Sequence, residues 1–329
     1  MPERSGWPSG LRGAGASRLG YSYAGLERFG EAEHTLQLAA ERKLEMPDLL
    51  VQRYQIAFVK GDKAVMKQAA AEGRGKAGAE DWLADQEAVA LAYWGRLNEA
   101  HPLATHASDL SRQGSQLDRA AAWDAGQSTW DSFFGKAATA RVSALAVLKR
   151  SSTRDVEYGV AFALALAGES REPRALADDL EKRFPEDTAA RFSYLPTVRA
   201  LLALNQNEPA QAIEQLRRAV PYELGAPPSA FQGTFGTFYP IYVRGLAYLA
   251  AHQGAQAATE FKKILDHPGI VFNDPVGAAA RVQLARAFAL SGDTMRAKTA
   301  YQDFLTLWTD ADPDIPIFQQ AKAEFARLQ

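Results

Sequence analysis

The chain has 329 residues, of which 47% are hydrophobic and 23% are charged, and its formal net charge is -2. This composition suits a folded chain with an apolar core and excludes wholesale disorder. The charge and a sequence pI near 6.3 give no support for binding to nucleic acid or to an anionic membrane surface. The chain contains no cysteine, which excludes disulfides and thiolate chemistry.

Residues 1–17 are rich in Gly, Ser and Arg and lack the apolar core of a secretory signal. We expect them to form a disordered or truncated segment ahead of a helical array over residues 18–329. No run in the chain approaches the ~20 apolar residues of a membrane-spanning helix. We therefore expect no direct membrane insertion and a cytoplasmic chain, with a membrane-tethered full-length relative left open.

Helical patterns fill most of residues 18–220, and turn residues separate them at the spacing of helix ends. Gly61, Gly95, Gly135 and Gly168 each separate two such patterns, and Pro185 ends the last of these pairs. Strand-like alternation of useful length is absent from the sequence. The expected helical pairs cover residues 48–72, 81–112, 115–150, 153–184 and 189–220.

Residues 221–240 interrupt the helical pattern with a long linker that is rich in Pro, Gly and aromatic residues. Linkers of this length inside a compact array are uncommon and are often functional. The rings of Phe231, Phe235 and Phe238 form a candidate ligand platform on this linker. The alternative is that the linker folds back and its rings fill a groove between neighbouring repeats, because exposing several rings is unfavourable.

Residues 240–308 contain two copies of one helical-hairpin pattern, in which a small residue, an aromatic residue, an alanine and a second aromatic residue recur at the same spacing. The first copy has Gly245, Tyr248, Ala257 and Phe261, and the second has Ala285, Phe288, Ala297 and Tyr301. A third copy near the start has Gly20, Tyr23, Ala32 and Leu36. Residues 313–328 are expected to form an amphipathic capping helix with a polar outer face.

This spacing resembles the tetratricopeptide repeat, a helix-turn-helix unit of roughly 34 residues. The resemblance implies an all-α fold, in which stacked helical hairpins form one elongated solenoid. We expect about six or seven helical pairs that wind as a right-handed superhelix.

The first helices of such hairpins line a concave face that receives an extended or helical peptide. The candidate peptide-binding face consists of Tyr194, Thr197, Leu201, Tyr239, Tyr242, Leu246, Leu249, Val282, Arg286 and Leu290. This face is more aromatic and apolar than charged, which favours a hydrophobic peptide or a contact within the chain. The alternative is that several of its rings pack against the 221–240 linker or against a neighbouring repeat.

The chain from about Leu19 onward also resembles the carboxyl-terminal repeat tails of acidobacterial eukaryotic-type serine/threonine protein kinases. The segments that carry this resemblance include Pro-Tyr-Glu-Leu-Gly (221–225), Leu-Asp-His-Pro-Gly-Ile-Val (265–271) and Asp-Phe-Leu-Thr-Leu-Trp-Thr-Asp-Ala-Asp-Pro-Asp-Ile-Pro (303–316). No kinase catalytic motif is recognisable, because Asp303 and Phe304 are followed by Leu305 rather than by Gly. The resemblance therefore implies a sensory or docking tail that lacks the kinase domain, and similar tails follow winged-helix regulator domains.

Gly73, Gly75 and Gly78 spell Gly-x-Gly-x-x-Gly, the pattern of nucleotide-binding loops. A phosphate loop needs a buried strand before it, whereas a helical segment over 69–71 precedes these glycines. A plain turn between repeats is the better interpretation.

His101 and His106 are five positions apart, which does not suit a metal pair on one helical face, and we expect both to be surface residues. Asp310, Asp312 and Asp314 lack the glycine and terminal glutamate of a calcium loop. We interpret these carboxylates as helix-capping and turn residues. We expect no catalytic, cofactor-binding or metal-binding residue.

These observations favour a noncatalytic protein-protein interaction scaffold that serves as the docking tail of a bacterial signalling protein of the kinase type. A stand-alone adaptor and the tail of a winged-helix regulator remain as alternatives, and a helical-repeat enzyme has less support. The expected partner is a protein or peptide and not a nucleic acid. The sequence leaves the oligomeric state open.

Overall fold

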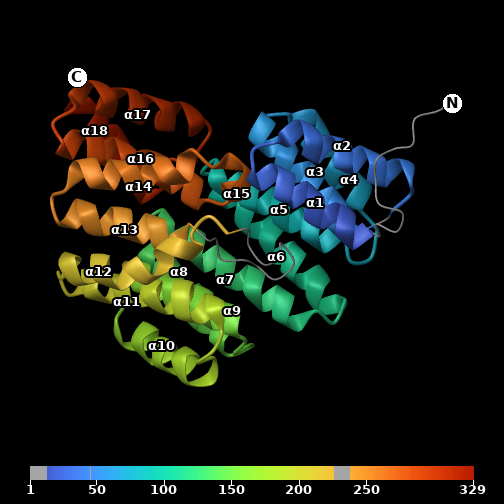
Figure 1. Cartoon of the computed structure of the whole chain (residues 1–329), viewed down its shortest axis with the longest axis horizontal. Helices are drawn as coiled ribbons and strands as arrows, with labels where there is room; N and C mark the ends of the chain where they lie inside the picture. Colours follow the sequence, from blue (N-terminus) through green and yellow to red (C-terminus); the bar gives the residue numbers. More distant parts are fainter. Residues whose placement is uncertain (1–12, 45, 226–237) are drawn as a thin grey trace.

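The computed structural model describes residues 13–44, 46–225 and 238–329, and the regular elements in these ranges are all helical. The first half contains α1 (Gly13–Gly25), α2 (Phe29–Glu41), α3 (Pro47–Lys60), α4 (Lys63–Gly73), α5 (Glu80–Tyr93), α6 (Leu97–Gln113), α7 (Leu117–Phe133), α8 (Ala137–Leu148) and α9 (Arg154–Leu166). The second half contains α10 (Arg171–Arg183), η1 (Ala190–Tyr194), α11 (Leu195–Asn205), α12 (Pro209–Leu216), η2 (Arg217–Tyr222), α13 (Tyr239–Ala250), α14 (Gly254–Leu265), α15 (Pro268–Val271), α16 (Val276–Leu290), α17 (Thr294–Leu307) and α18 (Pro316–Ala326). Figure 1 shows their arrangement. The all-α array of helical hairpins predicted from the sequence is confirmed.

Successive helices pair as hairpins, and eight such pairs occur in the described residues. The expected number of six or seven was too low. Each hairpin turn contains one residue with positive φ, and these residues are Glu27, Gly61, Gly95, Gly135, Gly168, Asn207, His252 and Gly292. In the α5/α6 turn, the Arg96 amide donates to the Leu91 carbonyl at 2.9 Å, which satisfies a carbonyl at the end of α5. The left-handed residue therefore closes each turn and starts the second helix antiparallel to the first.

The repeated small residue of the sequence pattern has a direct packing role. A Cβ atom placed on Gly245 in α13 would lie 2.6 Å from the ring of Phe261 in α14. Both Phe261 and its counterpart Tyr301 are buried. The Phe261 ring of α14 therefore fills the space that a side chain on Gly245 of α13 would occupy. We call this contact the interlock of α13 and α14.

The helices form two layers, because the first helix of most pairs is more deeply buried than the second. In α9, ten of 13 residues are buried, whereas in its partner α10 three of 13 are buried. Helix α11 contacts both α9 and α13, so the first helices also pack against one another. Sequence periodicity reflects this difference, since α10 is strongly amphipathic while α9 is apolar on nearly every side.

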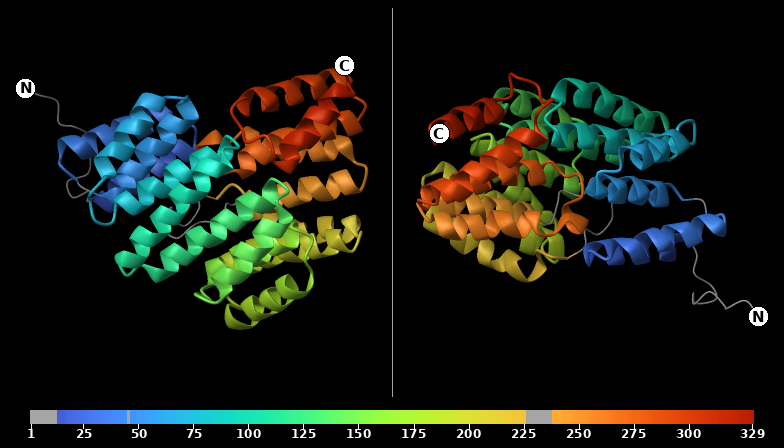
Figure 2. Two further views of the ribbon diagram at one scale, coloured as in Figure 1. Left: turned by 180° about the vertical axis from the view of Figure 1, so that it is seen from behind. Right: turned by 90° about the horizontal axis from the view of Figure 1, so that it is seen from above.

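The carboxyl-terminal segment turns back onto the middle of the chain, which closes the array. Trp308 is fully buried, and its Nε1 donates to the Tyr93 carbonyl oxygen at 2.9 Å. The Asp312 amide donates to the Gly95 carbonyl, and the Ile317 amide donates to the Phe134 carbonyl. Figure 2 shows the red carboxyl-terminal helices next to the green and teal helices of the middle of the chain. The helical-hairpin solenoid predicted from the sequence is therefore confirmed, and the structure adds a closure of the array that the sequence did not predict.

Helix α15 and Phe272 connect the amino-terminal hairpins to the rest of the array. Gly269 in α15 lies so close to the Ala24 carbonyl of α1 that a side chain at this position would overlap with it. Phe272 has a φ of 47° and a ψ of -123°, an unfavourable conformation for a residue with a side chain. Its side chain is 8% exposed and belongs to the apolar cluster of the first two hairpins.

Three expected boundaries differ from the structure. Helix α1 begins at Gly13, so residues 13–17 belong to the first helix instead of preceding the array. The first two residues of the expected linker, 221 and 222, belong to the 3-10 helix η2, while residues 226–237 lie outside the described residues. The final helix spans Pro316–Ala326 and not 313–328. No described helix has the length and apolarity that crossing a membrane requires.

Candidate functional site

The candidate concave face lies in the interior of the molecule. Six of its ten residues are buried: Tyr194, Thr197, Leu201, Tyr239, Tyr242 and Val282. The ring of Tyr239 stacks on Phe162 with 4.5 Å between centroids and meets Phe133 edge-on at 5.2 Å. These side chains pack against neighbouring repeats, as the alternative interpretation expected. In this conformation a bound peptide cannot reach them.

The other four residues of this set lie nearer the surface. Leu246 and Leu249 are half-buried on α13, and Leu290 at the end of α16 is 41% exposed. Arg286 is also half-buried, and its guanidinium pairs with the Glu324 carboxylate of α18 at 2.9 Å. Arg286 was expected to face a ligand, but its charge is paired with a carboxylate of the final helix.

Three rings were expected to form an aromatic platform on the 221–240 linker, and the structure describes one of them. Phe231 and Phe235 lie outside the described residues. Phe238 directly precedes α13, is 2% exposed, and has its ring 6.1 Å from the ring of His267. Phe238 is thus a core residue in this structure, in line with the packing alternative for that ring.

The glycine motif and the acidic cluster have structural roles. Gly73 ends α4, and Gly75 and Gly78 both have positive φ in the turn that leads to α5, which confirms the turn interpretation. Asp312 accepts a hydrogen bond from the Asn98 amide at 2.8 Å, so it caps α6 across 214 positions of sequence. Asp314 pairs with Lys136 at 2.8 Å. The capping role was therefore predicted correctly, although the capped helix is far away in the chain.

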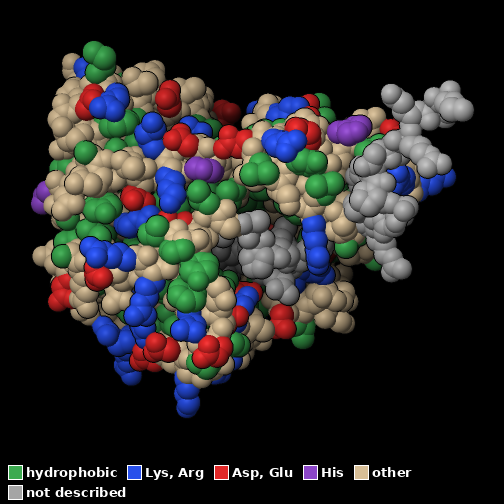
Figure 3. Space-filling model, in the orientation of Figure 1, with side chains coloured by type: hydrophobic (Ala, Val, Ile, Leu, Met, Phe, Trp, Pro, Cys, Tyr) green, Lys and Arg blue, Asp and Glu red, His purple; other side chains and the backbone are tan. Residues whose placement is uncertain are grey.

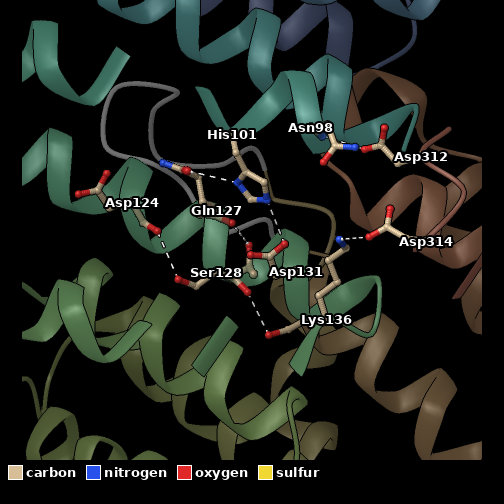
Figure 4. Close-up of polar contacts among 12 residues, drawn as sticks. Asn98, His101, Asp124, Gln127, Ser128, Asp131, Lys136, Asp312 and Asp314 are labelled. Carbon is tan, nitrogen blue, oxygen red and sulfur yellow. Dashed lines mark hydrogen bonds and ion pairs between the residues drawn. The ribbon is translucent and has the colours of Figure 1, made fainter. Parts of the chain in front are cut away.

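His101 is half-buried and paired, contrary to the expected surface role. Its Nε2 lies 3.1 Å from Asp131 Oδ1 and its Nδ1 lies 3.4 Å from Gln127 Oε1, as Figure 4 shows. The buried Asp131 carboxylate raises the pKa of His101 by accepting its hydrogen bond. The nearby Ser132 hydroxyl donates to the carbonyls of Ser128 and Ala163, so it is not aligned with the imidazole for nucleophilic chemistry. This pair holds α6 against α7.

Two surface hollows lie on either side of the carboxyl end of α10. The first has a volume of about 730 Å³ and lies between the α8/α9 connection and α10. Its lining comprises Asp118, Leu148, Lys149, Arg150, Ser151, Ser152, Thr153, Arg154, Arg183 and Phe184. Three of its arginines already bind carboxylates: Arg150 pairs with Asp124, Arg154 with Asp187, and Arg183 with Asp179.

The second hollow has a volume of about 620 Å³ and lies between α10, the start of α11 and η2. Its lining comprises Glu181, Pro185, Glu186, Arg191, Phe192, Leu195, Pro196, Arg199, Gln215, Arg218, Pro221 and Tyr222. The Phe192 and Tyr222 rings stack with 4.6 Å between centroids. Arg199 binds Glu181 through two hydrogen bonds of 3.1 and 2.6 Å and holds the pKa of that carboxyl below its usual range. We call these two hollows and the chain between them the α10 surface.

Exposed apolar side chains concentrate at the edge of the second hollow. Val220, Tyr222 and Leu224 are 50%, 43% and 47% exposed, and they alternate along η2 and the residues after it. Three exposed large apolar side chains within five residues are a local concentration, whereas scattered single ones need no explanation. Figure 3 shows Lys and Arg side chains, interspersed with Asp and Glu, over the region where Figure 1 places α10 to α12.

The α10 surface could not be predicted from the sequence, because its residues come from eight separate helical elements and the connections between them. Arg183, Arg199 and Arg218 stand on α10, α11 and η2 and follow no common spacing. The one local signal was the run Lys-Arg-Ser-Ser-Thr-Arg over 149–154, which reads as an ordinary polar loop. Within the described residues, no three His, Asp or Glu side chains come together as a metal site.

Comparisons with known proteins give a general likeness and no family. No protein-family model matches the chain, and no curated protein matches it. A solved structure of a tetratricopeptide repeat protein from Parabacteroides merdae aligns over 86% of this chain and 98% of its own length, with 11% identity and a TM-score of 0.46. Yeast Tom70 aligns over 96% of this chain and 81% of its own length, with 12% identity and a TM-score of 0.43.

Proposed function

We propose that the chain is a noncatalytic protein-protein interaction scaffold that binds a peptide segment of its partner on the α10 surface. The observation that carries this proposal is the combination, in one hollow, of stacked aromatic rings and arginines. Tyr and Arg are the residue types most enriched among the dominant contacts of protein interfaces. The buried concave face supports the same conclusion, because it leaves the outer side of the array for binding.

A peptide display experiment tests this function directly. Random peptides displayed on phage are selected against the immobilised chain, and the enriched peptides are then measured in solution. We expect the Tyr222→Ala variant to weaken binding of the enriched peptides about tenfold, because it removes a central aromatic contact. Leu26→Ala is the matched control, since Leu26 is also exposed but lies in the α1/α2 turn. If no peptide is enriched, or if the control weakens binding equally, the proposed function is wrong.

The resemblance to kinase tails supports a finer proposal, in which this scaffold is the docking part of a bacterial signalling protein. The segments 221–225, 265–271 and 303–316 carry that resemblance. An immunoblot of the native host with an antibody to residues 240–308, followed by peptide mapping, measures the mass of the endogenous protein. A mass well above 35.8 kDa together with kinase peptides supports the docking role. Peptides of a winged-helix domain would instead indicate the tail of a winged-helix regulator. A native product at the mass of this chain would indicate a stand-alone adaptor.

A further inference from the structure

The residues that line the α10 surface include more cations than carboxylates, although the chain as a whole carries a net charge of -2. Four cations and one carboxylate line the first hollow. Three cations and two carboxylates line the second hollow. The two hollows meet at consecutive residues, because Arg183 and Phe184 line the first while Pro185 and Glu186 line the second. A partner that follows this surface therefore meets positive charge at both ends.

Two of these cations form no close ion pair among the described residues. Lys149 and Arg218 are exposed and have no carboxylate oxygen within 4.0 Å in the parts of the chain that the structure covers, although the charge of Arg218 helps to lower the pKa of Glu181. The remaining arginines are held in place by internal carboxylates, as Arg199 is by Glu181. Fixed arginines shape the surface, and the two unpaired cations supply the charge that a partner neutralises.

The apolar content of the same surface defines the rest of the partner. Phe192, Leu195 and Pro196 line the second hollow beside the exposed ring of Tyr222. Phe192 and Tyr222 already stack on each other, so the ring faces between them are not open to a nucleobase. A protein segment fits this chemistry better than a nucleic acid does, because it brings apolar side chains together with isolated carboxylates.

We propose that the partner of the α10 surface is an extended, acidic protein segment. Its carboxylates pair with Lys149 in the first hollow and Arg218 in the second, and an apolar side chain between them packs against Tyr222. This inference rests on the proposed function, since it specifies the chemistry of the peptide that the same surface binds.

The test repeats the phage selection on three forms of the full chain. The first is the unmodified chain, the second is the double variant Lys149→Glu/Arg218→Glu, and the third is Lys67→Glu/Lys262→Glu. Lys67 and Lys262 are exposed on α4 and α14, so the third form has the same net charge as the second but changes distant sites. Circular dichroism confirms that all three forms are folded.

We expect peptides selected on the unmodified chain and on the Lys67→Glu/Lys262→Glu form to be enriched in Asp and Glu. The Lys149→Glu/Arg218→Glu form should lose this enrichment and bind the selected acidic peptides about tenfold more weakly, at roughly 0.5 to 1 kcal/mol for each exposed charge pair. Raising the salt concentration should weaken the same complexes, because exposed charge pairs are screened.

Three outcomes overturn the inference. Enriched peptides without acidic residues would refute the acidic partner while leaving the proposed function intact. Equal losses in both double variants would mean that only total charge matters. Tighter binding of a single-stranded DNA of about 12 nucleotides, lost in Lys149→Glu/Arg218→Glu, would assign the surface to nucleic acid. A selection that enriches no peptide at all would refute the proposed function itself.

Discussion

The amino-terminal and carboxyl-terminal hairpins follow the same repeat pattern but are held together by different chemistry. The core around α16 to α18 is aromatic: Trp308 packs against Phe134, Phe304 and Phe318 with centroid distances of 4.9, 4.8 and 5.7 Å. In the core of α1 to α3, four of the eight buried apolar residues are alanines, and buried polar residues, among them Ser17, Asp48 and Gln52, lie in the same helices.

From this difference we expect the two ends to differ in stability although they share one repeat pattern. Large rings bury more apolar area than alanines, and each buried aromatic side chain contributes correspondingly more to the free energy of unfolding. Phe272, from the second half of the chain, adds one large ring to the core of the amino-terminal hairpins. We therefore expect the two ends to unfold separately, with the amino-terminal hairpins opening first.

The largest expected effect is on the closure of the array. Trp308→Ala should lower the free energy of unfolding by about 4 kcal/mol, because it removes a fully buried ring and leaves a cavity. It also removes the hydrogen bond from Trp308 to the Tyr93 carbonyl, which joins the carboxyl-terminal segment to α5. Chemical denaturation followed by circular dichroism measures the loss.

Trp308→Phe is the matched control, since it keeps a ring but not the indole N-H, and it should lose less than half as much stability. Hydrogen exchange should show α5 to α8 losing protection together with α16 to α18 in the Ala variant. If only the carboxyl-terminal helices lose protection, the closed array is not a cooperative unit.

A smaller and more local effect is expected at Phe272. Phe272→Ala should destabilise the amino-terminal hairpins by about 3 kcal/mol, because it removes a ring from a small core. Hydrogen exchange should report faster opening of α1 to α3, while the protection of α13 to α18 stays unchanged.

Phe272→Gly separates the ring from the backbone at the same position. Glycine adopts positive φ without the cost that a Cβ atom imposes, so the Gly variant should be as stable as the Ala variant or up to about 1 kcal/mol more stable. An Ala variant that is clearly more stable than the Gly variant would contradict the strained backbone at residue 272.

The pairing of helices could be predicted from the sequence, because the determinants are local. A left-handed turn residue and a small residue opposite a ring recur at nearly constant spacing, as Gly245 and Phe261 show. Closure could not be predicted in this way. The contact of Trp308 with Tyr93 joins residues 215 positions apart and belongs to no repeat pattern.

The candidate concave face illustrates the same limit. Nine of its ten residues lie on α11, α13 and α16, but the neighbouring ring of Phe133 packs against Tyr239 and Tyr242, and both are buried. The α10 surface depends on side chains such as Arg199 and Arg218 that meet only in the folded chain. Repeat spacing therefore predicts which helices pair, while the exposed surface depends on how the array closes.

The interlocking glycine allows a matched pair of substitutions within the closed part of the chain. Gly245→Ala should lower the free energy of unfolding by about 2 kcal/mol, because the new Cβ atom would lie 2.6 Å from the Phe261 ring. Gly126→Ala in α7 is the control, since nothing lies within 4 Å of its added Cβ atom. There the substitution should stabilise the helix by up to about 1 kcal/mol. Thermal denaturation of both variants should show shifts of opposite sign, and equal shifts would contradict the interlock.

The smallest expected effect concerns the buried carboxyl group of the amino-terminal core. Burial raises the pKa of Asp48 to about 7, above its ordinary value near 3.8, and the Ser17 hydroxyl donates a hydrogen bond to this carboxyl group. Because the folded form holds the proton more tightly than the unfolded form, the proton's contribution to stability is complete below about pH 4. That contribution is lost as the pH rises through about 7.

Hydrogen exchange of α1 to α3, corrected for the intrinsic exchange rate, should therefore show decreasing protection between about pH 6 and 8. The change is small because most of the contribution has already been lost below pH 6. Asp48→Asn mimics the protonated carboxyl and should flatten this dependence, whereas Asp303→Asn on the exposed side of α17 should leave it unchanged. A pH dependence of equal slope in Asp48→Asn would mean that another group titrates. Asp85 in α5 would then be examined, because burial raises its pKa to about 8.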